Sequence, residues 1–217
     1  MKVYAINGSP RKNKNTATLL QKALDGVKES AKDKEIETEI INLYDLNYTG
    51  CISCFACKRL GGKSYGKCTV KDDIKEVLEK LSEADGIIFG SPIYLGNITG
   101  QLQSFLERLI FQYLVYDKNH SSIAPKKMST AFIYTMNVPE EIMNEVGYLK
   151  TFNHIGAYIE QIFTKPLVMY SNNTYQFDDY SKYKMEIFSE EEKAAHRKAQ
   201  FPIDCQKAFG LGVNLIK

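Results

Sequence analysis

Apolar and polar residues follow two spacings along this chain, one typical of buried strands and the other of amphipathic helices. The apolar runs that predict strands lie at 2–6, 36–42, 86–90, 128–135 and 165–170. The stretches with helical spacing begin near Thr16, Asp72, Thr99, Glu140 and Ser189. Strand and helix alternate five times. This alternation predicts an α/β fold with a doubly wound five-stranded parallel sheet and helices on both faces.

Local patterns refine this outline. The stretch 36–42 alternates apolar and polar residues, as an edge strand does, whereas 86–90 is typical of a central buried strand. The first helix is expected to end at the polar run Lys32–Lys34, and one helical pattern covers 140–161.

The last helix starts with a capping box, because Glu192 follows Ser189 by three residues. It runs toward Phe209, and Pro202 predicts a kink inside it. No repeat or linker divides the sequence, so we expect a single domain over 1–217 with a C-terminal helical extension from about residue 171.

The stretch Asn7–Thr16 joins the first predicted strand to the first predicted helix. A polar loop at such a junction binds anions, because free backbone N–H groups and the positive end of the helix dipole point at it. The side chains that add donors are the hydroxyls of Ser9 and Thr16, the amides of Asn13 and Asn15, and the guanidinium of Arg11. The loop therefore predicts a phosphate site. It holds neither the cysteine of a phosphatase nor the acidic residues of a receiver domain.

Two more loops follow central strands, and ligands of open α/β sheets bind at the carboxyl ends of strands. In the loop 91–100, Pro92 stiffens the turn and Ile93, Tyr94 and Leu95 offer apolar surface to a flat heterocycle. Gly96 permits close backbone approach, and Asn97 adds an amide. The loop 134–139 follows the next strand and faces the same edge of the sheet.

Three motifs carry a family resemblance: the GSPRxxxNT pattern within 7–16, SPIYLG at 91–96 and GQLQSFLER at 100–108. They resemble the NADPH-dependent FMN reductase family, in particular its branch of iron–sulfur flavoproteins, and the resemblance is strongest over residues 1 to about 137. It implies a flavodoxin-like sheet of order 2-1-3-4-5, bound FMN, NAD(P)H as co-substrate, and a homodimer or homotetramer.

The resemblance also implies which residues bind FMN. Those expected at the phosphate are Ser9, Arg11, Asn13, Asn15 and Thr16. Those expected along one side of the ring are Pro92, Ile93, Tyr94, Leu95, Gly96 and Asn97, and those on its other side are Thr135, Met136 and Asn137. One departure is Lys14, which stands where the family often has glycine.

Four of the five cysteines lie in the long connection 43–71. Cys51, Cys54 and Cys57 form a C-x2-C-x2-C run, and Cys68 follows after ten residues that include three glycines. Closely spaced thiolates suit iron–sulfur clusters. Three alternatives remain for these cysteines: they bind a [4Fe–4S] cluster, they bind a zinc ion, or they are free thiols. No metal ligand is assigned. Cys205 is expected in the core.

Composition limits the partners. Lysine and arginine are scattered and the net charge is +2, so nothing favours nucleic acid or a polybasic membrane contact. No apolar run is long enough to span a bilayer, and a strand starts within two residues of Met1, so no signal peptide is expected. The expected location is the cytoplasm.

These observations predict an NAD(P)H-dependent FMN oxidoreductase that passes electrons to a small-molecule acceptor, such as a quinone, an azo or nitro compound, or free flavin. The cofactor carries the chemistry, so no catalytic residue is predicted.

His154 is expected to be packed in a helix. The Tyr-rich tract in 170–183 predicts an interface or a cover over the flavin edge, with a plain surface as the alternative. A second hypothesis is an iron–sulfur flavoprotein that transfers electrons between proteins.

Overall fold

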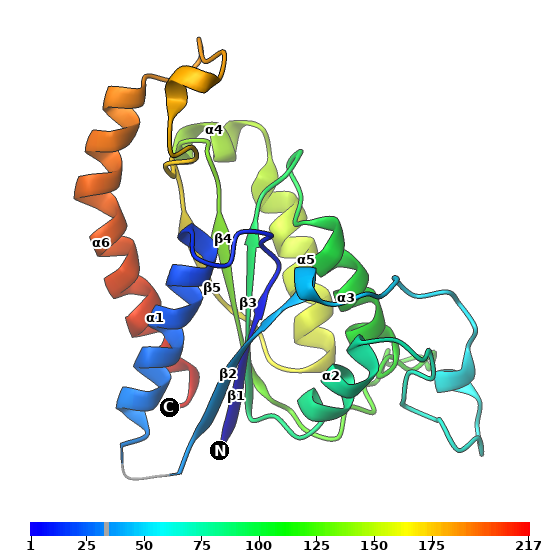
Figure 1. The fold of residues 1–217 in the computed structure, drawn as a ribbon. Coiled ribbons are helices and arrows are strands. Elements are labelled where there is room, and N and C mark those ends of the chain that lie inside the picture. Colours follow the sequence, from blue (N-terminus) through cyan, green and yellow to red (C-terminus); the bar gives the residue numbers. More distant parts are fainter. Residues whose placement is uncertain (33–34) are drawn as a thin grey trace.

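A five-stranded parallel sheet forms the centre of the molecule (Figure 1). The computed structural model describes residues 1–32 and 35–217, so Asp33 and Lys34 of the predicted polar run lie outside the described residues. The strand order is β2-β1-β3-β4-β5. The strands are β1 (Lys2–Asn7), β2 (Glu37–Asn42), β3 (Gly86–Pro92), β4 (Ser129–Thr135) and β5 (Leu167–Ser171). The flavodoxin-like order and the expected fold class are confirmed.

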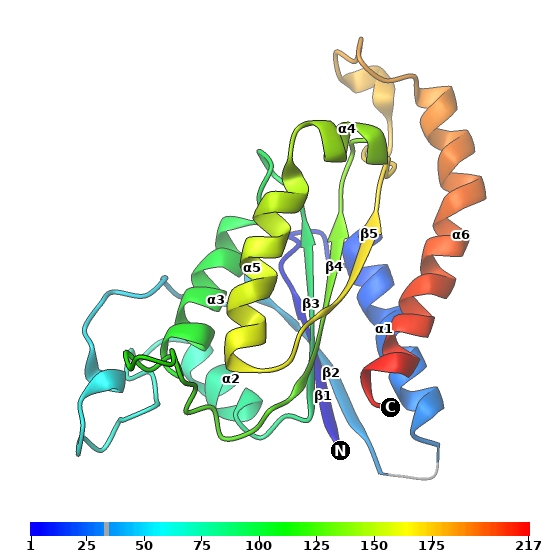
Figure 2. The same cartoon turned by 180° about the vertical axis from the view of Figure 1, so that it is seen from behind.

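Helices cover both faces of the sheet (Figures 1 and 2). One face carries α1 (Asn15–Ser30) and α6 (Glu190–Leu215), and the other carries α2 (Ile74–Leu81), α3 (Gly100–Phe111) and α5 (Tyr148–Ile162). The short helix α4 (Glu140–Glu145) precedes α5. Single 3-10 turns lie at Leu43–Asp45, Ala56–Lys58 and Tyr180–Lys182.

The burial of the strands follows their place in the sheet. β3 and β4 are buried almost throughout, as continuous apolar runs in a parallel sheet should be. β2 alternates exposed and partly buried residues, because it is an edge strand. An apolar core therefore lies on each side of the sheet. Phe89 and Phe132 belong to the core under α2, α3 and α5, whereas Ile88 belongs to the core under α1 and α6.

Two glycines allow α6 to pack along α1. A Cβ atom on Gly26 would lie 2.0 Å from the carbonyl oxygen of Phe209, and one on Gly212 would lie 1.8 Å from that of Ala23. Side chains do not fit at such distances, so only glycine permits this approach of the two backbones. The packing brings the first half of α6 next to the loop that precedes α1.

Two helices differ from the sequence-based expectation. The pattern at 140–161 predicts one helix, but the chain breaks into α4 and α5 at Gly147, whose φ is 77°. The last helix continues to Leu215 with Pro202 inside it, beyond the expected end near Phe209. Among the described helices, none is both long and apolar enough to cross a membrane.

Candidate functional site

Three loops meet at the carboxyl ends of β1, β3 and β4 and enclose a cavity of about 110 Å³. Its lining residues come from all three loops and from one further segment. They are Ser9, Arg11, Lys14, Asn15, Thr16, Pro92, Ile93, Tyr94, Thr135, Met136, Asn137, Thr174 and Gln176. The fold thus brings together most of the residues expected at the flavin.

The first loop is held in shape by short-range hydrogen bonds. The buried side chain of Asn7 accepts from the backbone N–H of Ser9 at 3.0 Å, and the Ser9 hydroxyl accepts from the N–H of Arg11 at 3.1 Å. Lys14 is the N-cap of α1, and among the described residues no side chain caps this helix end. The positive end of a 16-residue helix is therefore left for an anion.

The second loop is tied to the first by Thr99. The buried Thr99 hydroxyl donates to the carbonyl of Gly8 at 2.8 Å and also caps α3, and its backbone N–H donates to the Ser91 hydroxyl at 3.1 Å. The tip of the loop is a tight turn between Tyr94 and Asn97, whose backbones exchange hydrogen bonds of 2.8 and 3.1 Å.

Four of the expected flavin residues lie outside the 110 Å³ cavity. Leu95 and Gly96 form the turn at the loop tip with φ values of 51° and 78°, and the Leu95 side chain is fully exposed. Asn97 is exposed and faces a neighbouring groove. Asn13 is exposed in the first loop.

The segment after β5 forms an outer wall that sequence reasoning did not assign to the phosphate. Arg11 donates through Nη1 to the carbonyl of Gln176 at 2.6 Å, and Asn15 donates through Nδ2 to the carbonyl of Tyr175 at 3.0 Å. Lys14 forms an ion pair with Asp178. The sequence signals were the length and polar composition of the connection 171–188 and its Tyr-rich tract, which predicts an interface or a cover over the flavin edge.

Helix α6 contributes two cations to this region, and neither was expected from the sequence. Arg197 donates to the side-chain oxygen of Asn15. Lys193 is buried and donates through Nζ to both oxygens of Asn137, at 2.6 Å to the carbonyl and 2.7 Å to the side chain. Burial lowers the pKa of Lys193 to about 8, because a charged ammonium is less stable away from water.

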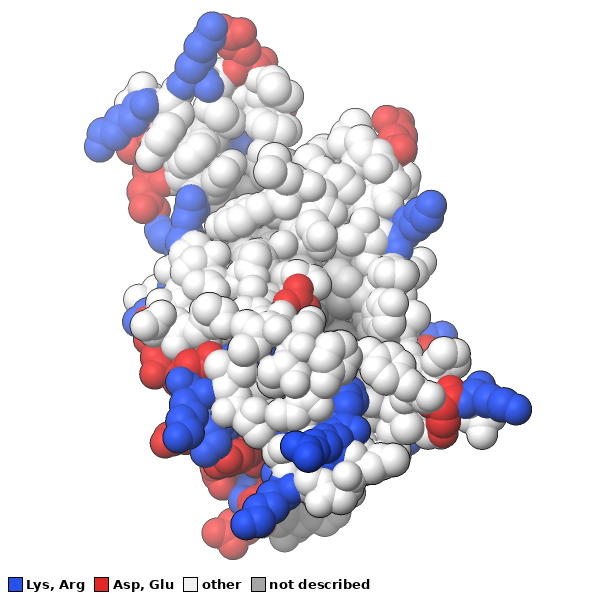
Figure 3. Space-filling model, turned by 90° about the vertical axis from the view of Figure 1, so that its right-hand side faces the viewer, with Lys and Arg blue, Asp and Glu red and all other residues white. Residues whose placement is uncertain are grey.

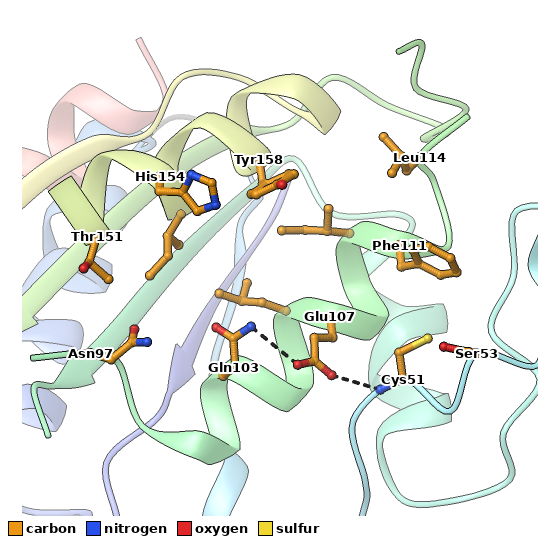
Figure 4. A pocket seen from close by; sticks show the side chains of 13 residues that line it. Cys51, Ser53, Asn97, Gln103, Glu107, Phe111, Leu114, Thr151, His154 and Tyr158 are labelled. Atoms are coloured by element: carbon orange, nitrogen blue, oxygen red, sulfur yellow. Dashed lines mark hydrogen bonds between the residues drawn. The ribbon is translucent and has the colours of Figure 1, made fainter. Parts of the chain in front are cut away.

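A second hollow lies between α3 and α5, a groove of about 560 Å³ (Figure 4). Apolar side chains of Leu106, Ile110 and Ile155 line it, and Phe111 and Tyr158 add aromatic surface. Figure 3 shows this face as mostly uncharged around a central hollow.

The groove extends from the second flavin loop to the start of the cysteine segment. Asn97 lines one end and Cys51 the other. Glu107 accepts from the backbone N–H of Cys51 at 3.1 Å and from Gln103 at 3.5 Å (Figure 4). His154 is exposed at the groove, so the expectation of a packed histidine is wrong.

The four clustered cysteines surround one small cavity of about 20 Å³. Cys57 is buried and Cys54 is exposed, and all five cysteines of the chain are free thiols. Burial raises the pKa of the Cys57 thiol. In residues 1–32 and 35–217, no three Cys, His, Asp or Glu side chains lie close enough to hold a metal ion. Cys205 is partly buried beside the core under α1 and α6.

Residues 1–129 match the model of the NADPH-dependent FMN reductase family. The chain belongs to this family. The match confirms the resemblance seen in the sequence and the FMN cofactor expected from it, since FMN is the cofactor of the family.

The curated relatives of this FMN reductase family member include iron–sulfur flavoproteins. One from Methanocaldococcus jannaschii is 44% identical over 108 residues, which are 50% of this chain and 51% of the relative. One from Archaeoglobus fulgidus is also 44% identical over 108 residues, 50% of this chain and 48% of the relative. The chain therefore spans about half the length of the curated relatives that it matches.

Solved structures share the fold over the whole chain. An NAD(P)H:quinone oxidoreductase from Methanothermobacter marburgensis has a TM-score of 0.70 at 15% identity, over 99% of this chain and 98% of that one. An FMN-dependent NADH-azoreductase from Bacillus anthracis in complex with FMN has a TM-score of 0.66 at 12% identity, over 100% of both chains. At such identities the likeness shows the fold alone.

The donors around the first loop fit the phosphate of FMN. Arg11 and Asn15 donate hydrogen bonds to the carbonyl oxygens of Gln176 and Tyr175. The oxygens of a phosphate group could accept from the same two donors. The cavity of about 110 Å³ is smaller than the roughly 300–1,000 Å³ of typical ligand pockets. The donor chemistry fits the phosphate of the cofactor, and the segment around 174–178 bounds the cavity on that side.

Proposed function

We propose that the chain is an FMN-dependent NAD(P)H oxidoreductase whose flavin lies in the cavity between the loops after β1, β3 and β4. The observation that carries this proposal is the convergence of the three loops on one cavity, with phosphate donors at its α1 end. Family membership supports it independently.

In this proposal, the residues of the chain bind and orient the cofactor. Arg11, Ser9, Asn15 and the free N–H groups at the start of α1 hold the phosphate. Pro92, Ile93 and Tyr94 lie along one side of the ring and Thr135–Asn137 along the other. Bound FMN supplies the hydride and electron transfer chemistry between NAD(P)H and the acceptor.

We propose that the acceptor is a flat, uncharged molecule with a conjugated ring, such as a quinone, and that it binds in the groove between α3 and α5. None of the residues that line the groove, as far as the structure describes them, is a lysine or arginine, and Glu107 adds negative charge. An anionic acceptor is therefore disfavoured. The aromatic rings of Phe111 and Tyr158 suit a flat partner.

FMN titration of the purified protein tests the first step. We expect tight binding of FMN, measured by the change in its visible absorbance. Under anaerobic conditions, NADH or NADPH should bleach the absorbance of the bound flavin. A protein that takes up no FMN would refute the proposal.

Steady-state kinetics test the acceptor. A Tyr158→Lys variant should have a higher KM for a neutral quinone and an unchanged rate of flavin reduction by NAD(P)H. Lys150→Gln, an exposed change on the same helix outside the groove, is the matched control. Equal KM values for both variants and the wild type would place the acceptor elsewhere.

A second candidate function is that of an iron–sulfur flavoprotein, in which a cluster on Cys51, Cys54, Cys57 and Cys68 exchanges single electrons with a protein partner. It is favoured by the arrangement of these four cysteines around one cavity and by the names of the relatives. Four thiolates around one cavity are the donor set that a [4Fe–4S] cluster takes. Iron and acid-labile sulfide in anaerobically prepared protein would support this function, and their absence would refute it.

We propose that the protein forms a homodimer or homotetramer in the cytoplasm. Large apolar side chains are exposed on the cysteine segment, among them Ile52, Phe55 and Leu60, and a second copy would cover such residues. Light scattering should give a mass of two or four times the 24.7 kDa of one chain. A monomer with FMN bound would refute the assembly and leave the activity standing.

A further inference from the structure

One buried polar atom beside the cysteines lacks a partner. Gln112, just after the end of α3, is only 3% exposed and lines the small cavity that the four cysteines surround. Its Oε1 accepts from the backbone N–H of Cys68 at 3.0 Å. Its Nε2 has no hydrogen-bond partner in the described part of the chain. A buried amide donor without an acceptor is unfavourable, so this atom requires an explanation.

The orientation of this amide is determined by its neighbour. If the amide were rotated by half a turn, its NH2 group would face the N–H of Cys68 and the hydrogen bond would be lost. The observed orientation therefore leaves the NH2 group as the free donor beside the cavity. An acceptor that is absent from the protein itself, such as a sulfur atom of a bound cluster, would satisfy it.

A second donor stands one helical turn earlier on α3. Arg108 is 1% exposed, and its Nε donates to Sγ of Cys68 at 3.3 Å. The same guanidinium is fixed by an ion pair with Asp72 and by a hydrogen bond to the carbonyl of Thr49 at 3.3 Å. Arg108 and Gln112 are four residues apart, so they lie on one face of the helix, and both line the cavity.

Hydrogen bonds to sulfur set the reduction potential of iron–sulfur clusters. A reduced cluster carries one more negative charge than the oxidised cluster. Donors and positive charge near its sulfur atoms therefore stabilise the reduced form and raise the potential.

We propose that Gln112 and Arg108 are positioning residues that donate hydrogen bonds, from Nε2 and Nε, to the sulfur atoms of an iron–sulfur cluster bound by the four cysteines. Through these bonds they raise its reduction potential. This inference rests on the second candidate function. It gives α3 and the residue that follows it a role, the donation of hydrogen bonds to the cluster, that the spacing of the cysteines does not predict.

Redox titration of the full chain, reconstituted anaerobically with ferrous iron, sulfide and FMN, tests this role. Gln112→Glu keeps an oxygen to accept from Cys68 and replaces the free donor by a carboxyl oxygen. We expect its cluster to have a lower midpoint potential, with the oxidised-to-reduced ratio at a fixed potential raised about tenfold, or about 59 mV for one electron. Gln206→Glu, the same change at an exposed position on α6, should leave the potential unchanged.

Gln112→Met is the second variant, because methionine keeps the side-chain volume and adds no charge. It should also lower the potential, with the same iron and sulfide content and the same circular dichroism as the wild type. Unchanged potentials in both variants with the cluster present would overturn the role of Gln112 and leave the cluster itself standing. Wild-type protein that binds zinc or no metal would instead refute the iron–sulfur function on which the inference rests.

Discussion

The hydroxyl oxygens of Thr16 and Thr135 lie 2.8 Å apart, and both side chains are buried. Thr16 belongs to the first turn of α1, and Thr135 is the last residue of β4. Their hydrogen bond joins the phosphate loop to the loop expected on the far side of the flavin. The hydrogen bond therefore fixes the separation of the two loops at this point.

Replacing both of these threonines should cost less than the sum of the two single replacements. Thr16→Val leaves the Thr135 hydroxyl buried without a partner, so we expect the free energy of unfolding to fall by about 1–3 kcal/mol. The double variant with Thr135→Val should lose less than the sum of the two single changes. Urea denaturation measures all three, and strictly additive losses would show that the two hydroxyls are not coupled.

Arg11 should distinguish FMN from riboflavin, which lacks the phosphate. We expect Arg11→Met to weaken FMN binding about tenfold to a hundredfold, as the loss of about 1.5–3 kcal/mol for a hydrogen bond to a charged group implies. Riboflavin binding should stay unchanged. Fluorescence titration with both flavins measures the difference. Lys12→Met is the control, because Lys12 is exposed and pairs with Asp45 outside the cavity. Equal losses for both flavins would exclude a phosphate contact.

Lys193 should make stability depend on pH above neutrality. Its pKa is about 8 in the folded protein, and an unfolded lysine has its usual pKa near 10.4. Between these values the unfolded state binds more protons, so this residue's contribution to stability rises as the pH increases from about 8 to about 10.4.

The comparison with Lys193→Met isolates this contribution from other groups that titrate in the same range. We expect the stability of the wild type relative to this variant to increase by on the order of 1–3 kcal/mol between pH 7 and pH 10.5. Urea denaturation at both pH values gives the difference. A constant difference would mean that Lys193 keeps an ordinary pKa.

The glycine contact between α1 and α6 predicts opposite effects at two positions on the same helix. Gly212→Ala forces a Cβ atom against the carbonyl of Ala23, so we expect a loss of at least about 1–3 kcal/mol in stability. At Gly210 a Cβ atom meets no heavy atom within 4 Å, so Gly210→Ala should gain about 0.5–1 kcal/mol from helix propensity. Thermal unfolding checks both. Similar shifts in Tm would contradict the close approach.

The phosphate loop could be predicted from the sequence because its signal is local. Ser9, Arg11 and Thr16 lie within one strand–loop–helix unit, and the hydrogen bonds that shape the loop join residues two positions apart. The prediction fails for some residues of the same loops. Asn13 and Leu95 belong to the same loops as the cavity residues but point away from the cavity, because backbone turns decide the direction of each side chain.

The outer wall of the site could not be predicted in this way. Gln176 and Arg197 reach the first loop across 165 and 182 residues of sequence, and no local pattern signals such contacts. The contact of Arg197 depends on the packing of α6 against α1, and that of Gln176 depends on the path of the chain after β5. Lys193 is a similar case, since a lysine in a charged helix start is expected in solvent and here is buried against Asn137.

Local patterns in the sequence predict the alternation of strands and helices, the anion-binding character of the first loop and the class of ligand that four closely spaced cysteines suit. These properties follow from the period of apolar residues and from side-chain chemistry along short stretches. The tertiary packing brings distant residues to two places: the 174–178 segment and α6 to the first loop, and Arg108 and Gln112 to the cysteines. The physical reason is that burial and hydrogen-bond partners are set by the packing of helices on the sheet, which brings together residues far apart in the chain.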